Sequence, residues 1–404
     1  MKFLATINEE PGIKVNKSAL GVLFSVVFLD NLGFAIVLPY LYFYLESLGG
    51  SPFLYGVLLA SYSLLSFIFT PIVARVSDRF GRRKILLGAL AVSSASYFIF
   101  GAANAIWLLF AGRMLAGSTA ATVPVAQAYV ADVTTSKDRL KYLGLLGAAA
   151  GIAFILGPAI GGTLSEILGY AVPSFLASAL AFVNLVSAYF RLPEPPRFRD
   201  PNKTVISLNA LMEVLRKRKI VLLMCSYFMF FLAFVFMQST LSPWLQSVFG
   251  FGSFETGMVF FFVGGVSAFT QALVLPRLGE IIDKSTLTLI SIGVFVAGLV
   301  ILSIVQNVSV LFAVAAVISI GFGIQYISLN TLISLHTNED TQGGTLGIAW
   351  AIAALAQTVA PVLATTTLSL GNTYGFGGLA FVVSAAIAGA SVPLLISLRK
   401  SQRG

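Results

Sequence analysis

The chain contains very few charged, cysteine and histidine residues, and each shortage excludes a class of protein. Only 10% of its 404 residues are charged, whereas a soluble globular protein has roughly a quarter. We therefore exclude a water-soluble globule. The single Cys225 excludes an internal disulfide framework and a cysteine metal cluster. The single His336 excludes a metal site or a catalytic triad that needs a second histidine.

Several functional motifs are also missing. There is no G-x-x-x-x-G-K-[ST] phosphate-binding loop, so we expect no nucleotide-binding domain in this chain that could drive transport by ATP hydrolysis. There is no TVGYG-like selectivity filter and no Ser/His/Asp or HExxH constellation. We therefore expect no enzymatic activity, no catalytic or metal-binding residues and no cofactor, with an ion gradient as the energy source. We also expect no removable signal peptide, because no short apolar region is followed by a small-residue cleavage site.

Most of the residues that are present are apolar. They make up 57% of the chain, and the mean hydropathy is +0.93. A helix that crosses a bilayer needs roughly 20 mostly apolar residues. Breaking the sequence at charged and Gly/Pro/Asn-rich points predicts twelve such helices, and therefore an all-α integral membrane protein. The expected spans are 20–45, 54–75, 85–103, 106–131, 141–165, 172–190, 220–248, 256–277, 286–305, 308–334, 344–369 and 375–397.

The basic residues are confined to alternate connections between the spans. Apart from Arg113, they lie before the first span, in or beside the connections that follow the even-numbered spans, and after the last span. By the positive-inside rule, both termini are expected in the cytoplasm, and we expect the membrane to be the plasma membrane. Basic loops can also bind nucleic acid. We interpret them as a topology signal facing anionic lipid head groups, with no nucleic-acid partner.

Two similar halves flank a polar segment. Residues 192–219 contain four prolines, a short helical apolar pattern and four consecutive basic residues, which predicts a cytoplasmic linker with an amphipathic surface helix. The regions 1–191 and 220–404 match at an offset of about 200 residues, and we interpret them as pseudo-symmetric six-helix bundles with a substrate site between them. The matching pairs are Leu38–Leu41 with Ser242–Leu245, Gly56 with Gly257, Leu109–Ala111 with Leu311–Ala313, and Pro158 with Pro361.

Two ionisable residues are predicted to lie inside the membrane. Asp30 falls about ten residues into the first span, roughly 15 Å along a helix, and Arg113 has a similar depth in the fourth. An ionisable group in hydrocarbon is costly and is therefore a functional candidate. We predict that Asp30 binds and releases a proton near the Arg113 cation. The alternatives are a structural ion pair between the two, or an Asp30 side chain that caps unwound backbone near Gly33 and Pro39.

Aromatic residues crowd the seventh and eighth spans, and no charged residue lies deep inside the spans of the second half, where the polar residues are neutral. Such a wall can bind an apolar or cationic ring compound by stacking and apolar burial. The alternative for each phenylalanine is plain contact with lipid. The predicted substrate-cavity residues are Asn31, Phe34, Gln127, Phe231, Phe234, Gln238, Gln325, Asn330 and Gln357.

The fifth span carries closely spaced glycines. Gly157, Gly161 and Gly162 surround Pro158. Small residues let helices approach closely and a proline bends a helix, so this segment predicts tight helix packing.

The loop between the second and third spans resembles a signature of the major facilitator superfamily. Residues 74–84 read ARVSDRFGRRK, which is similar to the pattern G-x-L-x-D-R-x-G-R-R except for Ala74 at the first glycine. The resemblance implies a cytoplasmic charge network that gates a conformational change. Its expected members are Asp78, Arg79, Gly81, Arg82 and Arg83, joined by Asp132 and Arg139 unless these two are ordinary solvated helix ends.

Three further segments resemble the twelve-span drug/proton antiporters of the tetracycline- and multidrug-efflux type. Residues 29–39 (LDNLGFAIVLP) resemble their span-1 motif, and residues 157–162 (GPAIGG) resemble their span-5 antiporter signature. Residues 113–117 (RMLAG) resemble the span-4 motif whose arginine is implicated in proton transfer.

The resemblance and the residues together predict proton-coupled export of small lipophilic or cationic compounds by alternating access. We expect a monomer whose partners are its cargo, protons and the lipid bilayer. The main alternative is a symporter or uniporter for sugars, organic acids or lipids on the same fold. A non-transporting receptor or scaffold and an intramembrane enzyme are the remaining alternatives.

Overall fold

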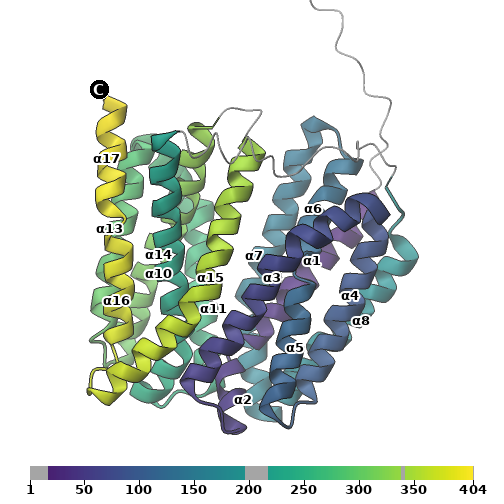
Figure 1. Cartoon of the computed structure of the whole chain (residues 1–404), viewed down its shortest axis with the longest axis horizontal. Coiled ribbons are helices and arrows are strands. Elements are labelled where there is room, and N and C mark those ends of the chain that lie inside the picture. The colour runs from purple at the N-terminus through teal and green to yellow at the C-terminus, as the bar shows by residue number, and fades with distance from the viewer. Residues whose placement is uncertain (1–16, 196–216, 338–341, 404) are drawn as a thin grey trace, which may run out of the picture.

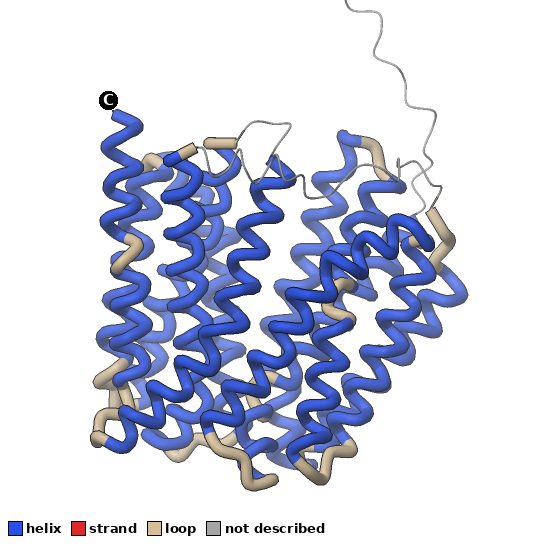
Figure 2. The backbone as a smooth tube through the Cα atoms, viewed as in Figure 1, coloured by secondary structure: helices blue, strands red, loops and turns tan. Residues whose placement is uncertain are grey.

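The computed structural model describes residues 17–195, 217–337 and 342–403. Nearly all of these residues are helical, and the described part of the chain contains no β-strand. It has twelve helical stretches that are long and apolar enough to cross a membrane, which confirms the predicted number of spans. Figure 1 shows the helices standing side by side in two groups, and Figure 2 shows the connecting loops gathered mainly at the two ends. The chain is therefore a multi-pass helical membrane protein built from two six-span bundles.

The first bundle contains the spans of the N-terminal part of the chain. Its fourth span is made of two helices, because the backbone is interrupted at residues 119–121. Two clusters of buried apolar side chains fill the interior of this bundle. Its helices are α1 (Lys17–Val37), α2 (Leu41–Ser47), α3 (Pro52–Phe80), α4 (Arg82–Gly101), α5 (Ile106–Ser118), α6 (Thr122–Val133), α7 (Ser136–Leu168) and α8 (Ala171–Arg191).

The second bundle has one larger apolar core. Its second span changes from α-helix to a short π-helix and back without a loop, and its last span consists of two helices. Its elements are α10 (Arg218–Phe249), α11 (Ser253–Phe269), the π-helix η1 (Thr270–Val274), α12 (Leu275–Ile281), α13 (Lys284–Leu302), α14 (Val308–Leu335), α15 (Gln342–Thr373), α16 (Leu379–Gly389) and α17 (Val392–Arg403).

Local sequence signals set several helix ends. Ser51 precedes Pro52, and its hydroxyl accepts a hydrogen bond of 3.3 Å from the backbone N–H of Leu54, so α3 begins at a capped proline. At the end of α10, Gly250 has a φ of +67°, a left-handed conformation that glycine adopts without steric strain. These signals allow short connections between antiparallel spans.

The two bundles touch mainly through α3 with α15 and α7 with α11, and α3 also contacts α10. The loops that carry lysine and arginine lie at one end of the molecule, where α3, α8 and α17 end and α10 begins. We call this the basic end. In Figure 1 the two groups of helices approach each other near α2, at the opposite end, and diverge toward the basic end.

Two sequence predictions need comment. The first span was expected to run continuously over 20–45, but the structure interrupts it at residues 38–40, between α1 and α2. The division of the chain at 192–219 stays a prediction, because residues 196–216, including the expected amphipathic helix, lie outside the described residues.

Candidate functional site

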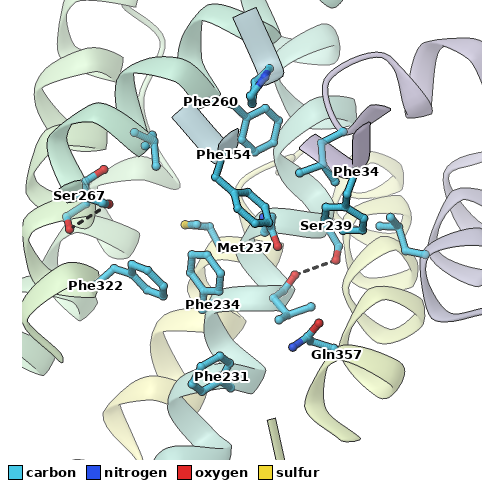
Figure 3. A pocket seen from close by; sticks show the side chains of 18 of the residues that line it. Phe34, Phe154, Phe231, Phe234, Met237, Ser239, Phe260, Ser267, Phe322 and Gln357 are labelled. Atoms are coloured by element: carbon cyan, nitrogen blue, oxygen red, sulfur yellow. Dashed lines mark hydrogen bonds between the residues drawn. The ribbon is translucent and has the colours of Figure 1, made fainter. Parts of the chain in front are cut away.

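A cavity of about 430 Å³ lies between the two bundles. The first bundle contributes α1, α3, α5 and α7 to its wall, and the second contributes α10, α11, η1, α14 and α15. Figure 3 shows side chains from both bundles around this space. The volume is within the range of small-molecule sites. The lining residues that bear on function are Phe34, Tyr55, Tyr62, Arg113, Phe154, Phe231, Phe234, Gln238, Phe260, Gln271, Phe322 and Gln357.

Aromatic rings form much of the cavity wall. On the first-bundle side, the ring of Phe34 lies 5.2 Å from the ring of Tyr62 and 5.9 Å from that of Phe154, measured between ring centres. On the second-bundle side, Phe234 and Phe322 stack with ring centres 4.0 Å apart. Such walls bind flat apolar molecules by burial and offset stacking.

Arg113 is the sole charged side chain among the described residues that line the cavity. It is only 3% exposed. Its guanidinium carbon lies 4.6 Å from the centre of the Tyr62 ring and 5.4 Å from that of Phe34, distances at which a cation is attracted to an aromatic face. Its Nε has no hydrogen-bond partner. The cation is therefore stabilised mainly by aromatic rings.

Asp30 lies near this wall but does not line the cavity. It is partly exposed on α1, one turn before Phe34, and the Thr122 side chain lies within hydrogen-bonding reach of its carboxylate. Thr122 begins α6, directly after the interruption of the fourth span. Tyr62 and Tyr97 lie within electrostatic range of both Asp30 and Arg113. Asp30 and Arg113, the two residues predicted to take part in proton transfer, thus have two tyrosine neighbours in common.

Neither alternative reading of Asp30 matches this conformation. Within the described residues, the ion pairs within 4 Å join Arg82 to Asp78 and Asp132, and none joins Asp30 to Arg113. The helix α1 continues past Asp30 to Val37, so the backbone around Asp30 is not unwound. Asp30 is thus a carboxyl group within a regular helix.

The nine residues predicted from sequence to bind substrate are divided by the structure into two groups. The lining members are Phe34, Phe231, Phe234, Gln238 and Gln357.

The other four residues lie away from the cavity in this conformation. Asn31 and Asn330 donate side-chain hydrogen bonds of 2.8 and 2.7 Å to backbone carbonyls four residues earlier. Gln127 is exposed on α6. Gln325 is fully buried, and its side-chain carbonyl accepts a hydrogen bond of 2.6 Å from Ser291.

Several lining residues escaped the sequence analysis. Tyr55, Tyr62 and Phe154 belong to spans that carry apolar residues on every face, so nothing in the local pattern marked their inward direction. The π-helix η1 likewise has no sequence signal that we could identify. Gln271 at its start lines the cavity, and a polar side chain in an apolar span is the one signal that could have selected it.

A charge cluster lies at the basic end of the first bundle. Arg82, at the start of α4, is buried; its Nε donates a hydrogen bond of 3.0 Å to Asp132, and it forms a second ion pair with Asp78. It also donates to the hydroxyl of Ser77 at 2.5 Å. Three of the seven predicted gating residues, on α3, α4 and α6, are thus joined through one guanidinium group.

The neighbouring Arg83 binds the segment that leaves the first bundle. Its guanidinium donates to the backbone carbonyl of Tyr189 at 2.6 Å, and its backbone N–H donates to Glu194 at 3.3 Å. Gly81 has a φ of +109°, and a Cβ there would lie 2.7 Å from the Glu194 carboxylate. Glu194 was not predicted from the sequence, although an acidic residue directly after the sixth span in a mostly basic segment is a usable signal.

The two remaining predicted gating residues lie apart from the Arg82 ion pairs. Arg79 is exposed, with its guanidinium carbon 5.8 Å from the centre of the Phe80 ring. Arg139 donates a hydrogen bond of 3.1 Å to the backbone carbonyl of Ala131, near the end of α6.

The glycines of the fifth span lie at close helix contacts. Cβ atoms at Gly157 and Gly161 would meet the α1 backbone at Ala35 and Ile36. A Cβ at Gly162 would instead lie 2.5 Å from the backbone carbonyl oxygen of Ser253, on α11 of the second bundle. One short segment of α7 therefore packs within its own bundle and against the other.

The repeated glycine and proline residues meet across the two bundles. A Cβ at Gly257 would lie 2.5 Å from the carbonyl oxygen of Pro158, and a Cβ at Gly56 would lie 2.6 Å from that of Pro361. Each repeated glycine thus packs against the repeated proline of the other bundle. We call these two contacts the glycine–proline contacts. They lie toward the opposite end, where α3 and α11 begin.

Two polar contacts between the bundles lie at the same end. Gln246 donates a hydrogen bond of 2.6 Å to the carboxylate of Glu46, and the Ser253 hydroxyl donates one of 3.0 Å to Glu166. Together with the glycine–proline contacts, they join the two bundles at the opposite end of the molecule.

We expect Arg82→Ala to destabilise the protein by about 3 kcal/mol, because it removes a buried cation and leaves the partly buried carboxylates of Asp78 and Asp132 unpaired. Thermal unfolding of the purified protein in detergent measures this as a lower Tm. The control is Arg79→Ala, which removes an exposed arginine from the end of α3 and should cost less than about 1 kcal/mol. Equal losses in both variants would show that the ion pairs of Arg82 contribute nothing.

Comparison with known proteins gives one family and many relatives. The family model described as "Major Facilitator Superfamily" matches residues 23–361. "Tetracycline resistance protein, class C" of Escherichia coli is 29% identical over 94% of this chain and 97% of its own length. "Tetracycline resistance protein, class B" of Escherichia coli is 30% identical over 84% and 85%. "Multidrug resistance protein 1" of Bacillus subtilis is 27% identical over 88% and 91%.

Solved structures share the architecture at lower sequence identity. The crystal structure of the human organic anion transporter MFSD10 (TETRAN) has a TM-score of 0.70 and is 22% identical, covering 96% of this chain and all of that chain. At this identity the likeness concerns the fold alone.

Proposed function

The chain belongs to the Major Facilitator Superfamily, and from this premise we propose that it exports small lipophilic or cationic compounds in exchange for protons. The family and the relatives consist of transporters, so the chain is not an enzyme. The observation that carries the proposal is the aromatic cavity between the two bundles, with Arg113 on its wall and Asp30 one turn from Phe34. Relatives named for tetracycline and multidrug resistance support export as the direction.

Alternating access explains how a cavity closed at one end can serve both sides of a membrane. The glycine–proline contacts and the hydrogen bonds of Glu46 and Glu166 close the opposite end in this structure. We propose that the basic end faces the cytoplasm, as the positive-inside rule predicts, and that the membrane is the plasma membrane. The structure then corresponds to a cytoplasm-facing state, and a rocking motion of one bundle on the other would open the far side.

Asp30 is the proposed proton carrier. It is the carboxyl group nearest the middle of the first span, and no basic residue within 4 Å neutralises it in the described part of the chain. In the proposed cycle, cargo enters from the cytoplasm or the inner leaflet while Asp30 is ionised. Cargo leaves outside, where Asp30 takes up a proton, and the protonated carrier returns and releases that proton into the cytoplasm. Proton and cargo need only bias the same two-state equilibrium in opposite directions.

The charge cluster around Arg82 is the proposed gating element. In this state its ion pairs hold α3, α4 and α6 together at the basic end. We propose that rocking changes the surroundings of Asp78, which lies at the end of the boundary helix α3. Because Arg83 and Glu194 connect the same region to the segment directly after α8, the motion would also move Glu194.

Transport into membrane vesicles tests the proposal. Everted vesicles from bacteria that lack their own exporters, and that express the chain, should accumulate tetracycline or ethidium when the vesicle interior is acidic. Collapsing the pH gradient with nigericin should release the compound. Vesicles without the chain are the control. Absence of gradient-dependent accumulation with both compounds contradicts the proposed exchange.

One observation favours organic-acid symport as a second candidate. Arg113 is the sole charge on the cavity wall in the described residues. An anionic cargo at Arg113 would attract a proton to the same region, so cargo and proton would travel together. The same vesicles distinguish the two functions, because a symporter of this kind would accumulate an organic anion only when the exterior is acidic.

A further inference from the structure

Two aromatic side chains hold the Arg113 guanidinium and also face the cargo cavity. Phe34 comes from α1 and Tyr62 from α3, and their rings contact each other as well as the guanidinium. All three residues line the cavity. A cargo molecule that fills the cavity therefore has to contact the rings that position the cation.

Tyr62 lines the cavity and is also near both charges, whereas the neighbouring Tyr55 and Tyr97 each have one of these two properties. It lies within electrostatic range of both Asp30 and Arg113. Tyr97 is near both charges, but its ring packs against Gly33 and does not line the cavity. Tyr55 lines the cavity and is near Arg113. Tyr62 thus borders the cargo space and is also close to both charges of the proposed proton site.

The ionisable groups around this point are few. Those that face Arg113 are Tyr40, Tyr55, Tyr62 and Tyr97, contributed by the stretch before α2 and by α3 and α4. Those that face Asp30 are Tyr62 and Tyr97. Arg113 and Asp30 thus share Tyr62 and Tyr97 as neighbours.

We propose that Tyr62 is a positioning residue that couples the occupancy of the cavity to the charge of Asp30. The inference rests on the proposed proton exchange. A cargo ring that packs on Phe34 and Tyr62 limits the movement of the Tyr62 ring and of the guanidinium stacked on it. In the proposed coupling, the cation is then held where it favours the ionised form of Asp30, so cargo binding releases the proton. By linkage, proton binding weakens cargo binding by the same factor.

The experiment measures protons released per bound probe. Purified full-length protein in weakly buffered detergent solution is titrated with tetracycline and with ethidium, and a pH-indicator dye reports the release. Wild-type protein should release protons on binding. Tyr62→Leu removes the ring from the guanidinium. This variant should still bind the probe, but the number of protons released per bound molecule should fall about fivefold or more. Tyr62→Phe, which keeps the ring, should restore the release.

Phe154→Leu is the matched control. Phe154 lines the cavity and contacts Phe34, but it is not one of the two rings over Arg113. Its loss should weaken probe binding while each bound molecule still releases its proton. A merely structural role for Tyr62 would instead reduce binding and release together in Tyr62→Leu.

The outcomes separate this inference from the function on which it rests. Undiminished proton release per bound probe in Tyr62→Leu overturns the role of Tyr62 and leaves proton exchange intact. Absence of release from wild-type protein that binds the probe overturns the proposed exchange, and the role of Tyr62 with it. If Tyr62→Leu does not fold, Phe34→Leu removes the other ring and carries the same expected loss.

Discussion

Asp30→Asn should abolish uphill efflux driven by a proton gradient while cargo still exchanges across the membrane. The amide has nearly the shape of the carboxyl group and can keep a hydrogen bond with Thr122, so the helix packing around α1 is preserved. It cannot bind or release a proton. In proteoliposomes, gradient-driven tetracycline efflux should fall to the level of liposomes without protein, whereas counterflow of a preloaded labelled compound should persist.

An exposed carboxyl group supplies the control for Asp30→Asn. Asp138 lies in the first turn of α7 at the basic end, outside the membrane-spanning part of that helix. Asp138→Asn makes the same chemical change and should leave gradient-driven efflux intact. Undiminished uphill efflux by Asp30→Asn would remove this residue from the proton pathway, and loss of counterflow as well would indicate damage to the cargo site.

Membrane solvation made the spans predictable from the sequence. A helix in lipid must satisfy all of its backbone hydrogen bonds internally, so twenty or so apolar residues leave few choices of structure. All twelve spans were found this way, and the charge pattern of the loops supported the count. The exact path inside a span was less accessible, because breaks and π-turns depend on neighbouring helices.

The repeated prolines illustrate this limit. Pro39 and Pro243 occupy matching positions in the two halves. The helix is interrupted by a turn at residues 38–40, whereas α10 continues past Pro243 without interruption. At the end of the turn, Tyr40 is fully buried, hydrogen-bonded at 2.7 Å to Ser174 on the neighbouring helix α8 and stacked on Tyr170, which directly precedes α8. Contacts between helices therefore stabilise the turn, and the local sequence does not specify it.

The candidate site was predictable only where a residue was chemically unusual for its place. A charge in an apolar span stands out, so Asp30 and Arg113 could be selected from the sequence alone. Their surroundings could not, because the face of a uniformly apolar helix that points inward is fixed by packing. Gln127 was predicted in the cavity and is exposed, whereas Tyr62 was not predicted and lines it.

Gly257→Val should prevent closure of the end opposite the basic end and inhibit transport strongly. The added Cβ would lie 2.5 Å from the carbonyl oxygen of Pro158 and 3.1 Å from the Cα of Gly162, which are backbone atoms that cannot turn away as a side chain can. Overpacking of this kind costs about 1–3 kcal/mol, which shifts a two-state equilibrium about 5- to 150-fold. We therefore expect counterflow to fall about tenfold or more, and residues 246–257 to exchange amide hydrogen faster.

The same helix provides a control that separates packing from helix propensity. Gly265 also lies on α11, and a Cβ there would meet no atom within 4 Å. Gly265→Val adds the same side chain and should leave transport and exchange close to wild type. Gly56 on α3 makes the equivalent contact with Pro361 on α15. Gly56→Val should therefore reproduce the defect of Gly257→Val. If either glycine variant transports at the wild-type rate with unchanged amide exchange, its glycine–proline contact does not hold the two bundles together at that end, and the closed state must depend on the hydrogen bonds of Glu46 and Glu166 instead.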